Sequence, residues 1–134
     1  SEIPRGYIFE KQNRRFKVES VLTSVKKMIG ITEEDESFDL DLLIHINSVF
    51  GILTQIGAGP VEGFVIKDKS AKWTDFIPEG SKLEFVKSYV ELKTKLIFDP
   101  PQSSTTKDAM EKCIAELEWR ISVAVDPGET IQGA

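Results

Sequence analysis

The sequence is poor in the residues that build catalytic and metal centres. Its 134 residues include one cysteine and one histidine. An intramolecular disulfide is therefore impossible, and a zinc site made from cysteines or from several histidines of one subunit has almost no basis. No apolar run approaches the roughly 20 residues that a membrane span requires. Residues 1–17 lack the unbroken apolar stretch of a signal peptide. We therefore expect a single domain that is assembled in the cytosol and needs no cofactor, metal or membrane.

Basic side chains are few and unevenly placed. Residues 1–19 carry five basic and three acidic side chains, a net charge of +2, and the remaining 12 basic and 19 acidic side chains leave a net charge of −7. A basic arm on an acidic body predicts that the arm seeks an acidic surface, such as that of a neighbouring copy. A solvated terminus without a partner is the alternative.

Three groups of polar residues invite a chemical interpretation, and none supports it well. His45 lies within a predicted helix and lacks a partner for acid–base work, so we expect a packed side chain. Cys113 falls on an apolar stripe, which predicts a buried structural thiol. The acidic residues between positions 33 and 41 lack the glycine and the alternating ligands of a calcium loop. We expect no catalytic residue and no enzymatic activity.

The second predicted helix also argues against sequence-specific DNA binding. If the first two helices formed a helix-turn-helix, the helix at 38–56 would enter the major groove. It contains no lysine or arginine and carries Asp39 and Asp41 in its first turn. Contacts with phosphates and base edges need positively charged side chains, and this helix offers negatively charged ones.

Hydrophobic periodicity predicts an all-α fold of four helices. They are expected over residues 20–29 and 38–56, over 81–98, and from 103–106 to about 125. The apolar stripe of the second helix is wide, so this helix should be buried or shared with another subunit. Ser37 is expected to cap it, and a capping box of Ser81 and Glu84 should start the third helix.

The segment between the second and third helices is less regular. Residues 64–66 and 71–73 have the composition of two short strands joined by a turn. We expect a small hairpin or irregular insert here, with one helical turn at 74–76. The predicted organisation is thus an arm at 1–19, a helical domain at 20–125 and a tail at 126–134.

Several segments in their order and spacing resemble one known family. Residues 22–31 read LTSVKKMIGI, an acidic loop follows, and residues 38–43 read FDLDLL. This pattern resembles the head–tail connector proteins of tailed bacteriophages, also called adaptor or head-completion proteins. Further segments are similar to a branch from phages of Gram-positive hosts: 45–50, 59–60, 69–73 and 98–101. The resemblance covers about residues 20–125, and the arm matches no opening typical of the family.

The resemblance implies a structural virion protein at the head–tail interface. Its family forms a homo-oligomeric ring, typically twelve-fold, between the portal and the stopper or tail-completion protein. Such a ring extends the DNA channel, offers the tail-docking surface, and lets the genome pass without sequence-specific binding. Terminal segments or the C-terminal helix grip the portal in this family. An acidic body agrees with such a channel, because like charge disfavours contact with phosphates.

On this interpretation three regions are expected to contact the ring or the portal. The first is the arm, the second is the insert, and the third is the C-terminal end. Trp73 and Trp119 are as well explained by core packing, since tryptophan is usually deeply buried. Two other classes stay open: a small helical adaptor or regulator acting as a dimer, and an enzyme using surface carboxylates. The contact residues expected in the three regions are Phe9, Arg14, Arg15 and Phe16; Phe64, Ile66 and Trp73; and Trp119, Val123, Val125 and Ile131.

Overall fold

The computed structural model describes residues 19–125, which form five helices and no strand. The helices are α2 (Val21–Ile29), α3 (Asp39–Ile56), α4 (Trp73–Phe76), α5 (Ser81–Phe98) and α6 (Ser104–Val125). The all-α prediction is confirmed, and the four long helices lie where the periodicity places them. Of the predicted regions, the arm up to residue 18 and the tail from residue 126 lie outside the described residues.

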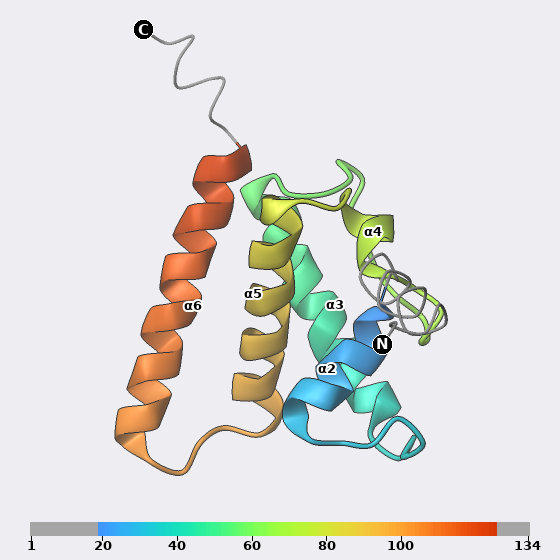
Figure 1. Ribbon diagram of the computed structural model, residues 1–134, viewed down its shortest axis with the longest axis vertical. Coiled ribbons are helices and arrows are strands. Elements are labelled where there is room, and N and C mark those ends of the chain that lie inside the picture. Colours follow the sequence, from blue (N-terminus) through green and yellow to red (C-terminus); the bar gives the residue numbers. More distant parts are fainter. Residues whose placement is uncertain (1–18, 126–134) are drawn as a thin grey trace, which may run out of the picture.

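Helix α5 is the centre of the arrangement. It packs against each of the other four helices, whereas α6 has its main contacts with α5 alone. Figure 1 shows α5 between α6 on one side and α2 and α3 on the other. The core therefore lies where α2, α3 and α4 meet α5, and α6 covers one flank of it.

The ends of the helices follow local chemistry, with two corrections. Ser20 caps α2, because its hydroxyl accepts a hydrogen bond from the Thr23 N–H at 3.2 Å. Ser37 does not cap α3: its hydroxyl donates to Asp35, and the cap position is Phe38. The Ser81 capping box is also wrong, since α5 already includes Ser81 and no side chain caps it. In both cases the observed cap lies one residue from the predicted one. The helices themselves are correctly predicted, but the side chains expected to cap them do not do so.

The insert between α3 and α4 is irregular, so the hairpin prediction is wrong. Residues 64–66 and 71–73 do not pair, because their backbones have other partners. The Asn47 amide binds Ile66 twice, donating to its carbonyl at 2.9 Å and accepting from its N–H at 2.7 Å. At the other end, the Ala71 carbonyl accepts from the Val21 N–H at 3.0 Å. The insert is thus tied to α3 and to the start of α2.

Four aromatic rings fill the core beneath the insert. Phe50 lies 4.8 Å from Phe76 and 4.9 Å from Phe64, measured between ring centroids. Trp73 is 1% exposed, and its indole N–H donates to the Ser24 hydroxyl at 3.0 Å. The chain passes this cluster at Gly59, where φ is +79° and a Cβ atom would lie 2.3 Å from the Phe76 ring. Only glycine combines that backbone conformation with so close an approach.

Candidate interaction surfaces

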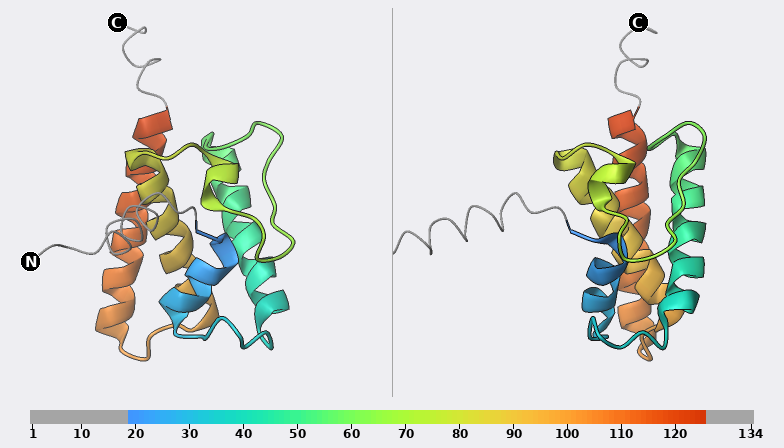
Figure 2. Two further views of the ribbon diagram at one scale, coloured as in Figure 1. Left: turned by 45° about the vertical axis from the view of Figure 1, so that its right-hand side comes forward. Right: turned by 90° about the vertical axis from the view of Figure 1, so that its right-hand side faces the viewer.

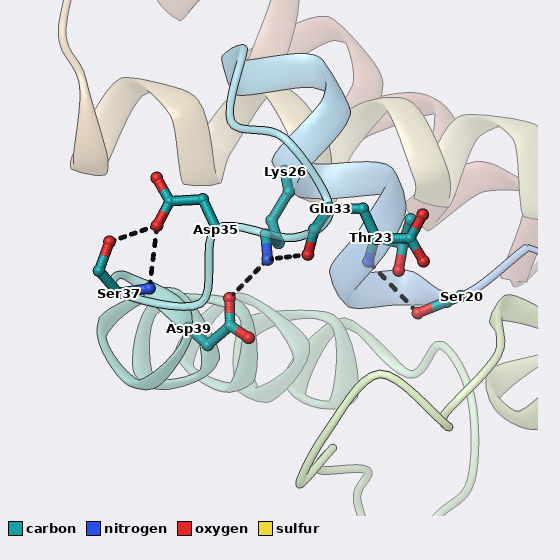
Figure 3. A network of polar contacts seen from close by, with 7 residues as sticks. All are labelled: Ser20, Thr23, Lys26, Glu33, Asp35, Ser37 and Asp39. Carbon is teal, nitrogen blue, oxygen red and sulfur yellow. Dashed lines mark hydrogen bonds and ion pairs between the residues drawn. The ribbon is translucent and has the colours of Figure 1, made fainter.

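A buried lysine fixes the acidic loop between α2 and α3. The Lys26 side chain is 3% exposed, and its ammonium lies 2.9 Å from Asp39 Oδ1. It also donates to the Glu33 carbonyl at 3.0 Å. Within the described part of the chain, Asp39 Oδ1 has no other partner, so its pairing rests on Lys26 alone. Figure 3 shows Lys26 reaching both groups.

The acidic side chains of this loop face solvent. Glu33, Glu34, Asp35 and Glu36 are all exposed. Hydrogen bonds from the Ser37 hydroxyl and N–H lower the pKa of Asp35, so this carboxylate keeps its charge in mildly acidic solution. The loop therefore presents a fixed, negatively charged surface.

A second acidic group lies where the described chain begins. Glu91 on α5 is partly buried beside Glu19 and Glu84. Burial raises the pKa of Glu91 to about 7; Lys87 opposes this increase, and the charges of Glu19 and Glu84 add to it. The site is thus short of positive charge at the point from which the basic arm departs.

The raised pKa of Glu91 predicts a pH-dependent stability. The folded pKa lies above the value of 4.5 taken for a free glutamate, so the protonated form favours the folded state. The free energy of unfolding should fall as pH rises from about 4.5 to about 7 and level off above that. Glu91→Gln should remove this decline and be more stable than the unchanged protein at pH 8. Urea unfolding across pH measures this decline, with Glu111→Gln, at an exposed glutamate of α6, as the control. Equal pH slopes in all three proteins would contradict the prediction.

The outer face of α6 is a candidate contact surface. Ile114 and Ile121 are buried against α5, and the Tyr89 hydroxyl of α5 donates to Glu118 at 2.8 Å. Burial, together with this hydrogen bond and the Glu118 charge, raises the pKa of the Tyr89 phenol. Trp119 lies on the opposite side of α6 and is 66% exposed; Val123 beside it is also exposed. The sequence predicts both residues as contacts, and both side chains are free on the surface of residues 19–125 to meet a partner.

The other predicted contact residues have different positions. Ile66 and Trp73 are buried in the core, and Phe64 is half-buried against Phe50 and Phe76. Val125 is the last residue of α6. Phe9, Arg14, Arg15, Phe16 and Ile131 lie outside the described residues.

The structure also gives the positions of His45 and Cys113, the two residues considered as reactive groups. His45 lies with its ring centroid 6.5 Å from that of Phe98, as a packed side chain. The prediction of a buried Cys113 is wrong, because its side chain is exposed. The stripe that faces α5 runs through Ile114, Leu117 and Ile121, and Cys113 stands to one side of it.

The outer face of α3 is not among the three predicted contact regions, although the wide apolar stripe of this helix allowed for sharing with another subunit. Leu40 and Ile44 are 71% and 59% exposed, although they belong to the most apolar helix. Further along the same face, Gly51 borders a shallow hollow of about 330 Å³. The signal was present in the sequence: apolar residues off the core stripe, followed by a glycine inside a helix.

Residues 19–125 thus define an acidic helical subunit with exposed apolar helix faces. In this range no group of three or more His, Cys, Asp or Glu side chains is arranged to hold a metal ion. None of the helices described is long and apolar enough to cross a membrane. Exposed apolar faces are typical of proteins that work by assembling with others.

Comparison with known families gives the identity of this class. A family described as phage connector protein matches residues 21–128, so the chain belongs to it. The protein is therefore a structural component of a phage head–tail connector, and the resemblance found in the sequence is confirmed at this level. No curated protein and no solved structure matches the chain.

Proposed function

We propose that copies of this chain form a closed ring between the portal and the stopper or tail-completion protein, with the DNA channel running through it. The family match over residues 21–128 carries the proposal. The exposed apolar faces of α3 and α6 support it, because a ring subunit must offer surface to two neighbours. The ring is typically twelve-fold in this family, and its place is the head–tail interface of the virion, after assembly in the host cytoplasm. The branch from phages of Gram-positive hosts is part of the proposal.

In this role the protein acts through its surfaces and not as an enzyme. The body outside residues 1–19 carries a net charge of −7. DNA would pass such a surface without sequence-specific binding, because both carry negative charge. A measured DNA affinity that collapses with added salt would contradict this part of the proposal.

Electron microscopy of the protein, alone and mixed with the portal protein of the same phage, tests the proposal. Rings stacked on the portal are the expected result, even if the isolated protein is monomeric. Dimers in solution that ignore the portal would favour the alternative of a small helical adaptor or regulator.

The arm is proposed to dock on a neighbouring copy or on the portal through Phe9, Arg14, Arg15 and Phe16. Its basic side chains match the exposed carboxylates at 33–36. Deleting residues 1–17 should leave the helical domain folded and weaken ring assembly on the portal. Circular dichroism checks the fold, and co-sedimentation with the portal checks assembly. If the shortened protein assembles with unchanged affinity, the arm has no such role.

At the C-terminal end, Trp119 and Val123 are proposed contacts, together with Val125 and Ile131. Phe64, at the edge of the hollow, stays a proposed contact of the insert. Ile66 and Trp73 would act beneath that surface, by supporting it from the core.

A further inference from the structure

Gly51 is unexplained by the fold of the single subunit. It lies inside α3 and is exposed, and a Cβ atom added there would meet nothing within 4 Å. Glycine inside a helix loses more conformational freedom on folding than alanine, so the position lowers stability without easing any internal contact. An approach from outside the subunit would explain why a side chain is missing.

The missing side chain opens a hollow on the outer face of α3. Its lining comes from Asn47, Gly51 and Thr54 on α3 and from residues 62–65 of the insert. The two Asn47–Ile66 hydrogen bonds hold the insert against α3 and so fix one wall. The volume of about 330 Å³ is large enough for one indole ring. Glu62 is the one charged residue of the lining.

The outer face of α6 carries a matching protrusion. Trp119 is the largest exposed apolar side chain of the described residues, and it is flanked on its face by Ala115 and Val123. Three exposed charged residues share this side of α6: Asp108, Lys112 and Glu116. Glu116 is paired with Arg120 at 2.8 Å, and Lys112 has the charge opposite to that of Glu62 at the hollow. Tryptophan, with tyrosine and arginine, is enriched among the residues that contribute most to the binding energy of protein interfaces.

The hollow on α3 and the Trp119 surface on α6 are different surfaces and lie on different sides of the subunit. In the left view of Figure 2, α5 separates α6 from α3. One copy can therefore offer its tryptophan to a second copy while receiving that of a third. We infer that Trp119 of each copy inserts into the Gly51 hollow of the next, as the head-to-tail contact of the ring; the inference rests on the proposed function. Contacts of this kind close into a ring when the rotation between copies allows it.

Two substitutions remove the two halves of this contact separately. Trp119→Ala deletes the protrusion and keeps the hollow, while Gly51→Leu fills the hollow and keeps the tryptophan. Each should weaken self-association by about 30-fold or more, as expected for a central tryptophan anchor. Neither should lower the melting temperature, since both positions face solvent. Met28→Ala, an exposed apolar residue on α2, is the matched control and should associate like the unchanged protein.

Mixing the two variants tests the direction of the contact. Sedimentation velocity, at concentrations up to about 1 mM, should show each variant alone as a monomer. The mixture should form one-to-one heterodimers and nothing larger, because only one intact contact remains per pair. Unchanged association of either variant, or a mixture that stays monomeric although the unchanged protein associates, would overturn the inference. If the unchanged protein associates only on the portal, the variants are compared there, and a variant that forms rings on the portal as the unchanged protein does would overturn it. Portal binding by the unchanged protein tests the proposed function separately. If the unchanged protein self-associates and both variants do not, but the unchanged protein does not bind the portal, the inference holds and only the proposed function is contradicted.

Discussion

Replacing Asp39 by asparagine should lower the free energy of unfolding by about 3 kcal/mol. Lys26 is almost fully buried, and Asp39 is the carboxylate that lies 2.9 Å from its ammonium. Removing one partner of a buried ion pair leaves an uncompensated charge in the protein, at a cost of about 3–5 kcal/mol. We expect the lower end of that range, because Asp39 is at the edge of the core and the Glu33 carbonyl still accepts from Lys26. Urea unfolding measures the difference.

The matched control for this prediction is Asp41→Asn. Asp41 lies in the same first turn of α3 and, like Asp39, interacts favourably with the helix dipole, but its side chain is exposed. A carboxylate in this position contributes about 0.3–1 kcal/mol. If the two asparagine variants lose equal stability, the ion pair contributes nothing beyond the dipole. Lys26→Met combined with Asp39→Asn should recover part of the loss, since the buried charge is then gone.

Trp73→Ala should cost about 3–5 kcal/mol, the range for removing a large aromatic side chain from a core. The indole is packed near Phe50 and donates to Ser24, so its deletion leaves a cavity and removes one hydrogen bond, although the Ser24 hydroxyl still donates to the Ser20 carbonyl. Trp73→Phe should cost less, because the ring is kept and only the hydrogen bond and part of the volume are lost. Thermal or urea unfolding, followed by circular dichroism, measures both variants.

The chain supplies its own control in the second tryptophan. Trp119→Ala should change the free energy of unfolding by less than about 0.5 kcal/mol, because the side chain faces solvent. Substitution by alanine is thus expected to affect a different property at each of the two positions. At Trp73 it affects folding, and at Trp119 it affects assembly. Similar losses of stability in both variants would contradict the core and surface assignments.

The helices were predictable because their signals are local. The apolar spacing in α3 and α5, and the pair Pro100 and Pro101 after α5, act over a few residues and do not depend on the rest of the chain. The caps were predicted one residue away, since a serine near a helix start does not have to cap it: α3 and α5 begin after Phe38 and Gly80, and no side chain caps either helix. Ser37 satisfies Asp35 instead of starting α3.

The insert was not predictable for the opposite reason. Residues 64–66 have the composition of a strand, but the backbone N–H and carbonyl of Ile66 bind the Asn47 side chain, nineteen positions away. Such a bond depends on how the insert lies on α3, which no local pattern contains. The composition gave equal grounds for burying Trp73 and Trp119. The fold separates them, because Trp73 begins α4, which packs on α5, while Trp119 lies on the side of α6 that faces away from α5.

The one-sided attachment of α6 has a consequence for motion within the subunit. Because α6 packs mainly on α5, we expect it to open as a cooperative unit, exposing Ile114 and Ile121, while the core around Phe50 and Trp73 stays intact. Local openings of this kind require less free energy than global unfolding. If a neighbouring copy binds Trp119, it holds α6 from its second side and suppresses the opening. Ring closure would then complete the ordering of the subunit, so that amide protons of α6 exchange slowly only after assembly.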